Sequence, residues 1–393
     1  MPIRIIGRIQ MTAADSARAD SENEFVIAEL NHRFRNLLNL VRSLISQSQT
    51  STTSVAEFAR DIGNRIESLA RAHDQLTTAH HAPVSLHRLI AAEARAYTQG
   101  NGHPPIILSG ENAMIAPRAV TTLTLVLHEL MTNARKYGSL SLLDGAAGGL
   151  LEITTAREPN GDLVLHWQES GGPPVEKPTR RGFGTTILER SIPHDLGGTV
   201  LIEYTASGVA VRIGLPARHL VDDRAGKLVS DSASAITPQG TGAVPDAIPE
   251  AATNPGVTSF AADMPQISPA TLRPRFTALV VEDNMLIAMD AEEALYEFGA
   301  SEVKLCANVA AALASIANSR DGTAFDVALL DVNLGDETSE AIAMALREAA
   351  IPFVITTGFG DYVSDISAYA GAPVLTKPYA PDALSQALAQ LMD

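Results

Sequence analysis

A polar stretch at residues 218–274 divides this chain of 393 residues into parts that must fold separately. The stretch is rich in Ala, Pro, Ser, Thr, Asp and Gly and has almost no aromatic side chains. Such a composition cannot bury enough apolar surface to offset the entropy that is lost when a chain becomes ordered. We therefore expect a flexible linker at 218–274, with folded domains on both sides of it.

Two helical patterns precede the linker. Residues 25–48 carry apolar side chains in the heptad spacing of a helix packed in a bundle, at Leu30, Phe34, Leu37, Val41 and Leu44. After a turn at 49–53, residues 54–79 carry a second apolar stripe, at Val55, Phe58, Ile62, Ile66, Leu69 and Leu76. Because two antiparallel helices make half of a four-helix bundle, a second copy of the chain would complete the core. We predict a helical hairpin for dimerisation at 25–82, after a tail at 1–24.

Residues 83–217 change to a mixed α/β pattern. An amphipathic helix is expected at 120–137, with a buried face formed by Leu123, Leu127, Leu130 and Ala134. Strand patterns follow at 151–155 and 163–167, and a hairpin with regular alternation is expected at 200–215. This region is predicted to be an α/β domain.

Residues 275–393 alternate strands and helices regularly. Apolar strands are expected at 278–281, 303–305, 327–330, 353–355 and 374–375, with helical segments between them. This order predicts a doubly wound, five-stranded parallel sheet, whose active site lies at the carboxyl ends of its strands.

Composition and charge exclude several classes of protein. A net charge of −16, with no local basic patch, argues against nucleic-acid binding. The single cysteine, Cys306, excludes an intramolecular disulfide framework and suits a reducing cytoplasm. No apolar run approaches the roughly 18–20 residues that a membrane span requires, so no membrane insertion is expected.

Three short motifs before the linker carry candidate chemistry, and the first surrounds His32, between Asn31 and Asn36. The heptad places His32 opposite the buried stripe, where another domain can reach a solvated imidazole. Arg33 and Arg35 flank it and could neutralise an incoming phosphoryl group.

The second and third motifs place polar side chains together by their spacing. Glu129 and Asn133 lie four residues apart on the predicted helix, so they project from one face, together with Lys136. Trp167 and Glu169 lie two residues apart at the end of a strand and therefore face the same side.

In this order the motifs resemble the phosphoacceptor box, N-box and G-box of the HWE histidine kinases, a HisKA_2-like family named for its His, Trp and Glu. The resemblance implies histidine phosphotransfer at 25–82 and a Bergerat-type (GHKL) ATP-binding sandwich at 83–217, with ATP and Mg²⁺ as cofactors. It makes His32 the phosphoacceptor, Asn133 a ligand of Mg²⁺ and Glu129 a candidate general base.

The same resemblance outlines the nucleotide pocket. Glu169 stands where other histidine kinases have an aspartate that binds the adenine amino group, and Trp167 and Lys136 are expected to belong to the same site. Gly171 and Gly172 would let the backbone pass close beneath the base. A second glycine box would form a lid with N–H groups open to the phosphates, at Arg181, Gly182 and Gly184.

Two positions depart from a simple assignment. Many histidine kinases have a carboxylate directly after the phosphoacceptor, but this chain has Arg33 there, which leaves the base unassigned. His128, the family's His, has no clear role, and structural packing is as plausible for it as catalysis.

A second candidate site follows the strands of residues 275–393. Glu282 and Asp283 end the first strand and Asp331 ends the third, so three carboxylates should meet in one pocket. Their mutual repulsion calls for a cation, and Mg²⁺ is the natural occupant because it prefers oxygen ligands.

Together with Thr357 and Lys377-Pro378, these carboxylates resemble a response-regulator receiver domain with a flavodoxin-like fold. The resemblance implies that the carbonyl of Asn333 completes the metal site and that Asp331 is the nucleophile toward phosphohistidine. It assigns Thr357 to a phosphoryl oxygen and Lys377 to the phosphoryl charge, and it implies a cis peptide bond before Pro378. Val374 stands where many receivers have a switch aromatic, which puts aromatic coupling in doubt.

We expect a soluble, cytoplasmic, bacterial hybrid histidine kinase that autophosphorylates His32 with ATP. The phosphoryl group would pass to Asp331 or to a separate response regulator or phosphotransfer protein. Dimerisation through the hairpin is favoured, although a monomer is also possible. Two alternatives stay open: a kinase gated by its receiver after phosphorylation in trans, and a phosphatase or scaffold of a phosphorelay.

Overall fold

The computed structural model describes residues 38, 41–46, 54–78, 82–98, 105–141, 149–175, 183–205, 208–221, 234–235, 275–319, 325–358 and 366–392. They build two compact units, and each is described by itself. The first contains a sheet whose strands lie between residues 106 and 235, and the second contains a sheet within residues 275–393. Residues 41–46 are helical, as expected. The motif around His32 and the turn at 49–53 lie outside the described residues.

Helix α2 (Val55–Thr78) confirms the second predicted helix, but its buried face differs from the predicted stripe. Val55 is 85% exposed and Ile66 is 37% exposed. The buried positions are Ile62, Arg65, Ser68, Leu69 and Ala72. The difference arises because α2 packs against helix α4 (Pro117–Tyr137), which presents charged side chains as well as apolar ones.

The first unit is built on a mixed six-stranded sheet in the order β6-β7-β5-β4-β2-β9. Only β2 and β4 pair in parallel, and the other neighbours are antiparallel. The strands are β2 (Ile106–Gly110), β4 (Leu150–Arg157), β5 (Leu163–Ser170), β6 (Thr199–Thr205), β7 (Gly208–Leu215) and β9 (Ser234–Ala235). The predicted strands at 151–155 and 163–167 and the hairpin at 200–215 are confirmed.

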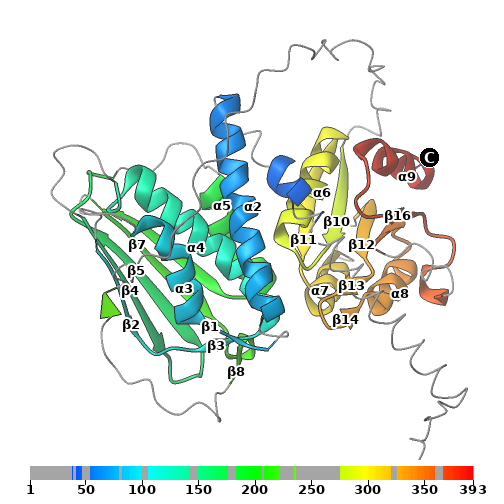
Figure 1. Ribbon diagram of the computed structural model, residues 1–393. Coiled ribbons are helices and arrows are strands. Elements are labelled where there is room, and N and C mark those ends of the chain that lie inside the picture. The colour runs from blue at the N-terminus through cyan, green and yellow to red at the C-terminus, as the bar shows by residue number, and fades with distance from the viewer. Residues whose placement is uncertain are drawn as a thin grey trace, which may run out of the picture. The chain divides into compact units, whose positions relative to one another are not determined.

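Helices cover one face of this sheet (Figure 1). Helix α4 contacts α2, α3 and α5, so it is the centre of the helical layer. The helices beside it are α3 (Leu86–Ala94), which continues into η1 (Arg95–Tyr97), and α5 (Phe183–Leu196). The predicted buried face of α4 is confirmed, because Leu123, Leu127, Leu130 and Ala134 are each at most 4% exposed.

The fold of the first unit continues into the predicted linker. Residues 217–219 form η2 (Ala217–His219), where His219 is 3% exposed. A small antiparallel sheet then joins β1 (Val84–Ser85), β3 (Met114–Ile115) and β8 (Leu220–Val221). Strand pairing and burial therefore extend the folded unit to Val221, and β9, which also lies in the predicted linker, pairs with β2. The other residues of 222–274 lie outside the described residues.

The second unit confirms the predicted five-stranded parallel sheet, in the order β11-β10-β12-β15-β16. Its strands are β10 (Phe276–Val281), β11 (Ala300–Cys306), β12 (Val327–Asp331), β15 (Phe353–Thr357) and β16 (Val374–Thr376). The central strands β12 and β15 are buried at every position, as expected for strands covered on both faces.

Helices connect these strands and pack on the sheet (Figure 1). They are α6 (Met285–Glu297), α7 (Val309–Ser319), α8 (Glu340–Glu348) and α9 (Pro381–Met392), together with η3 (Ser367–Tyr369). A short hairpin of β13 (Asn333–Leu334) and β14 (Glu337–Thr338) follows β12. In the part of the chain that the structure describes, no helix combines the length and apolar character needed to cross a bilayer.

Candidate functional site

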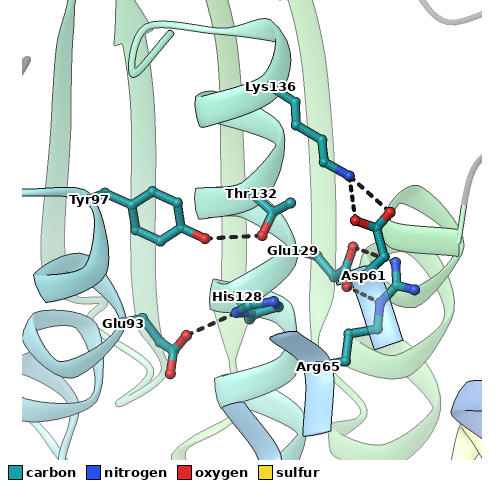
Figure 2. Close-up of polar contacts among 8 residues, drawn as sticks. All are labelled: Asp61, Arg65, Glu93, Tyr97, His128, Glu129, Thr132 and Lys136. Atoms are coloured by element: carbon teal, nitrogen blue, oxygen red, sulfur yellow. Dashed lines mark hydrogen bonds and ion pairs between the residues drawn. The ribbon is translucent and has the colours of Figure 1, made fainter. Parts of the chain in front are cut away.

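The charged face of α4 confirms that Glu129 and Lys136 project together, and both contact α2 (Figure 2). Arg65 donates from Nε to Glu129 Oε1 at 2.7 Å and from Nη2 to Oε2 at 3.4 Å. This pair is buried, because Arg65 is 8% exposed and Glu129 is 4% exposed. Lys136 donates from Nζ to both carboxylate oxygens of Asp61 at 2.9 Å. Glu129 and Lys136, which were expected at a nucleotide, thus form ion pairs with helix α2.

The start of α5 lies close to the same face of α4. A Cβ added to Gly184 would lie 2.5 Å from Glu129 Oε2 and 3.4 Å from Asn133 Nδ2. Only glycine permits this approach, because the first of these distances is shorter than real Cβ contacts. The structure therefore brings Gly184 and Asn133 together, as the nucleotide motifs predict. A helix N-terminus at this place also offers N–H groups to an anion.

Trp167 and Glu169 face the same side of β5 and bond to each other. The indole Nε1 donates to Glu169 Oε1 at 3.1 Å, and the backbone N–H of Ser139 donates to Oε2 at 2.9 Å. Glu169 is 2% exposed. Burial raises the pKa of Glu169, and the hydrogen bonds from Ser139 and Trp167 offset only part of that effect. Oε2 thus ties β5 to the residue just after the end of α4, whereas Oε1 is bonded within β5.

Glycines let these elements meet. A Cβ added to Gly138 would lie 1.8 Å from Glu169 Oε2, and one added to Gly172 would lie 2.8 Å from the backbone of Gly138 and Ser139. Gly171 has a φ of 68°, in the left-handed region that favours glycine. The G-box glycines therefore pack beside the carboxyl end of α4, near the residues of the N-box. Arg181 and Gly182 lie outside the described residues.

His128 is buried and belongs to a series of polar contacts between helices. Its Nδ1 lies 3.2 Å from Glu93 Oε2, and Arg71 donates to the two oxygens of Glu93 at 3.1 and 3.0 Å. Burial alone would raise the pKa of Glu93, but the hydrogen bonds and charges of His128 and Arg71 outweigh it and lower the pKa. His128 is 5% exposed and Glu93 is 2% exposed, so these contacts lie inside the helical layer.

Sequence reasoning missed four residues of these contacts: Asp61, Arg65, Arg71 and Glu93. The signal that could have found them is charge inside a buried pattern. Arg65 interrupts the apolar side of α2, and Glu93 lies on the otherwise apolar buried face of α3. The sequence alone pairs neither with a partner.

The second unit gathers the predicted acidic cluster. Carboxylate oxygens of Glu282, Asp283 and Asp331 all lie within 4.8 Å of one another. Lys377 contacts Glu282 and also Asp331 Oδ2, the latter at 2.8 Å. Burial alone would lower the pKa of Lys377, but the carboxylates of Asp331 and Glu282 raise it above its ordinary value. One ammonium balances one of three carboxylates, so the donor set fits a hard divalent cation.

The other predicted residues of this site surround the cluster. Thr357 ends β15 and is 1% exposed, and its carbonyl accepts from the backbone N–H of Lys377 at 2.7 Å. Asn333 follows β12 directly, in β13. The Lys377-Pro378 bond is cis, as predicted. Val374 is 40% exposed at the start of β16.

Comparison with known proteins finds a match to one family model. Residues 29–112 match the family model described as HWE histidine kinase, and these residues are called the HWE domain below. The matched residues of this HWE domain include α2 and α3 with Asp61, Arg65, Arg71 and Glu93.

Curated relatives of the HWE domain are named for light activation. A "Blue-light-activated histidine kinase" from Brucella ovis is 31% identical over 215 residues, which cover 54% of this chain and 43% of the relative. A "Blue-light-activated histidine kinase 1" from Erythrobacter litoralis is 32% identical over 208 residues, covering 52% of this chain and 56% of the relative. The chain thus spans about half the length of these relatives.

A solved structure of a blue-light activated histidine kinase from Erythrobacter litoralis is also similar. It is 16% identical, with a TM-score of 0.39, over 54% of this chain and 62% of that one.

Proposed function

We propose that this chain is a hybrid histidine kinase that autophosphorylates His32 with ATP and passes the phosphoryl group to Asp331 or to a separate response regulator. The observation that carries the proposal is the convergence of N-box, G-box and α5 residues at one part of α4, in the same unit as α2 and α3 of the HWE domain. Gly184 approaches Asn133, and Glu169 is bonded to the backbone just after α4. We further propose a helical hairpin at 25–82, an ATP-binding GHKL-type domain that continues to Val221, and a flavodoxin-like receiver at 275–393.

In the first step, a nitrogen of the His32 imidazole attacks the γ-phosphorus of ATP. A nitrogen–phosphorus bond forms as the bond to the β–γ bridging oxygen breaks, ADP leaves with that electron pair, and the imidazole releases its ring proton to solvent. Asn133 would hold Mg²⁺ at the nucleotide, and the N–H groups at the start of α5 would face the phosphates, beside Gly184. Trp167 and Glu169 fix the G-box backbone against α4, which shapes the pocket for the base.

In the second step, a carboxylate oxygen of Asp331 attacks the phosphorus of phosphohistidine. An oxygen–phosphorus bond forms, the nitrogen–phosphorus bond breaks, and the imidazole regains a proton. Lys377 lies 2.8 Å from Asp331 Oδ2 and remains protonated because its pKa is raised, so it offsets the added charge. Mg²⁺, held by Glu282, Asp283 and Asp331 with the Asn333 carbonyl, would neutralise the phosphoryl oxygens, and Thr357 would bond to one of them.

The experiment is incubation with radiolabelled ATP and Mg²⁺, followed by acid or alkali treatment. Wild type, His32→Ala and Asp331→Ala are compared, with the exposed His166→Ala as a matched control. Phosphohistidine is acid-labile and alkali-stable, whereas an aspartyl phosphate is lost in alkali. We expect alkali-stable label on Asp331→Ala and on the control, and no label on His32→Ala. Absence of label on wild type would contradict the proposal, and label on His32→Ala would move the acceptor elsewhere.

A further inference from the structure

We propose that Asp61, Arg65 and Arg71 of helix α2 are positioning residues for the kinase reaction, and that Glu129, Lys136 and His128 of α4 act through them. This inference rests on the proposed function. The contacts form three rungs between the helices: Asp61–Lys136, Arg65–Glu129, and Arg71–Glu93–His128. Figure 2 shows these contacts except those of Arg71.

The rungs specify one register between the helices. Asp61 and Arg65 are one turn apart on α2 and have opposite charges, as do their partners Lys136 and Glu129 on α4. A slide of α2 by one turn, about 5.4 Å, would bring Arg65 toward Lys136 or Asp61 toward Glu129. Like charges placed opposite each other disfavour both shifted registers. The alternation of sign therefore fixes where α2 sits along α4.

The contact face of α2 is shaped for close packing as well as for charge. Ser68 is fully buried and Ala72 is 1% exposed, one turn apart, so small side chains lie on the buried side of α2 beside the third rung. Ile62 and Leu69 flank them at 9% and 4% exposure. Because the middle rung is buried among these side chains, opening it would leave a charge without its counter-ion.

The third rung gives His128 a role through another residue. Its imidazole meets Glu93 of α3, and Glu93 meets Arg71 of α2, so one carboxylate joins three helices. His128 and Glu129 are neighbours on α4 and engage α2 by separate routes. His128 is thus a positioning residue that acts through Glu93 and Arg71.

The consequence concerns the distance between the two reacting partners. Asn133, the proposed Mg²⁺ ligand, lies on α4 between Glu129 and Lys136, the two residues that hold α2. Helix α2 follows the segment that carries His32 in the chain. The rungs therefore set the hairpin against the nucleotide, and they assign Glu129 and Lys136 to that task in place of the base and the nucleotide ligand expected from the motif.

The test is a charge swap in the outer rung, made in the full-length chain. Asp61→Lys, Lys136→Asp and the double variant are compared with wild type, and the exposed Arg60→Asp on α2 serves as the matched control. We expect each single swap to lower the turnover of autophosphorylation by about tenfold or more, because like charges then face each other. The KM for ATP should stay near the wild-type value, and the double variant should recover the wild-type turnover to within about twofold.

Two results would overturn the proposal. Lys136 would be a nucleotide ligand if the double variant bound MgATP as weakly as Lys136→Asp does. The outer rung would be only a surface contact if Asp61→Lys kept the wild-type turnover. Arg65→Ala and Arg65→Lys provide a second series, in which the lysine should restore part of the turnover that alanine loses.

Amide hydrogen exchange of α4 separates this proposal from the proposed function. Protection of α4 should fall in each single swap and return in the double variant, whether or not the chain transfers phosphate. If wild type carries no label but the protection of α4 falls in the single swaps and returns in the double variant, the kinase proposal fails and the proposed register of α2 on α4 is kept. If the exchange of α4 is the same in all variants, the register proposal fails even though the kinase is active.

Discussion

Around helix α4 the buried carboxylates of Glu129 and Glu93 each face an arginine of α2, whereas at the carboxyl ends of β10 and β12 two carboxylates contact one lysine. Glu129 is paired with Arg65, and Glu93 with Arg71. In the second unit, Lys377 faces both Glu282 and Asp331, and Asp283 lies close by. The first arrangement is balanced and stabilises one packing of helices. The second gathers three carboxylates around one ammonium, and this arrangement suits a divalent cation, which can in turn neutralise the oxygens of a phosphoryl group.

The largest expected effect is the loss of balance in the first arrangement. Arg65→Ala should lower the free energy of unfolding of the first unit by about 3–5 kcal/mol, because it leaves Glu129 buried without its partner. Urea unfolding followed by the fluorescence of Trp167, the single tryptophan, measures this change. Arg60→Ala, on the exposed side of the same helix, should be close to neutral. Equal stability of the two variants would remove the basis for calling this pair a structural contact.

The second effect sharpens the contrast, because removal of a carboxylate from the cluster should weaken the binding of a metal ion and should not destabilise the fold. Asp283→Asn should lower the affinity for Mg²⁺ by about tenfold or more, since affinity follows the charge of the ligands. Isothermal titration with MgCl₂ in the absence of nucleotide measures the affinity. Glu302→Gln, an exposed carboxylate early in β11, is the matched control. Unchanged affinity in Asp283→Asn would contradict the assignment of this residue to the metal.

A third, smaller effect follows from the lowered pKa of Glu93. A carboxyl group whose pKa is lower in the folded than in the unfolded state stabilises the fold at pH values above its unfolded pKa, 4.5. That stabilisation is lost as the pH falls through the pKa of the folded state. Glu93→Gln should therefore cost about 1 kcal/mol at pH 7 and nearly nothing well below pH 4.5. Thermal unfolding of the variant and of Glu152→Gln across this pH range measures it. A difference that does not depend on pH would show that the charge of Glu93 is not what matters.

The smallest effect is expected at Glu169, which is buried among neutral donors and has a raised pKa. Its contribution has the opposite sign: stability is fully present below pH 4.5 and is lost as pH rises through the folded pKa. Glu169→Gln should change stability at pH 7 by less than about 1 kcal/mol, because the relief of a buried charge offsets a weakened hydrogen bond. The slope of stability against pH should flatten in the variant. A steeper slope would mean that Glu169 is stabilised as an anion.

The sequence was informative wherever a local pattern has one structural meaning. Strand patterns predicted β4, β5, β6 and β7 of the first sheet, although not β2 and β9, and apolar runs predicted the strands of the second sheet. Carboxylates at strand ends predicted the cluster around Asp331. Spacing on a helix or strand predicted that Glu129 and Lys136, and likewise Trp167 and Glu169, share a face. Such predictions succeed because the period of a helix or strand is set by the backbone within a few residues.

The partners of those side chains could not be predicted in the same way. Nothing local indicates that Glu129 meets Arg65, 64 residues earlier, or that Glu169 receives its hydrogen bonds from Trp167 and from Ser139. The buried side of α2 was also predicted incompletely, because an apolar stripe cannot show that a charged residue will be buried against an opposite charge.

By itself the sequence determined the order of strands and helices and the chemical types of the candidate site residues, since these depend on periodicity and on residue identity. Only the tertiary structure decided which charges meet. The reason is physical: a buried ion pair depends on distances of a few ångströms between elements that are far apart in the chain. Those distances are set by the packing of α2, α3 and α4 on one another, and they turn three residues of the nucleotide motif into the contacts that hold α2.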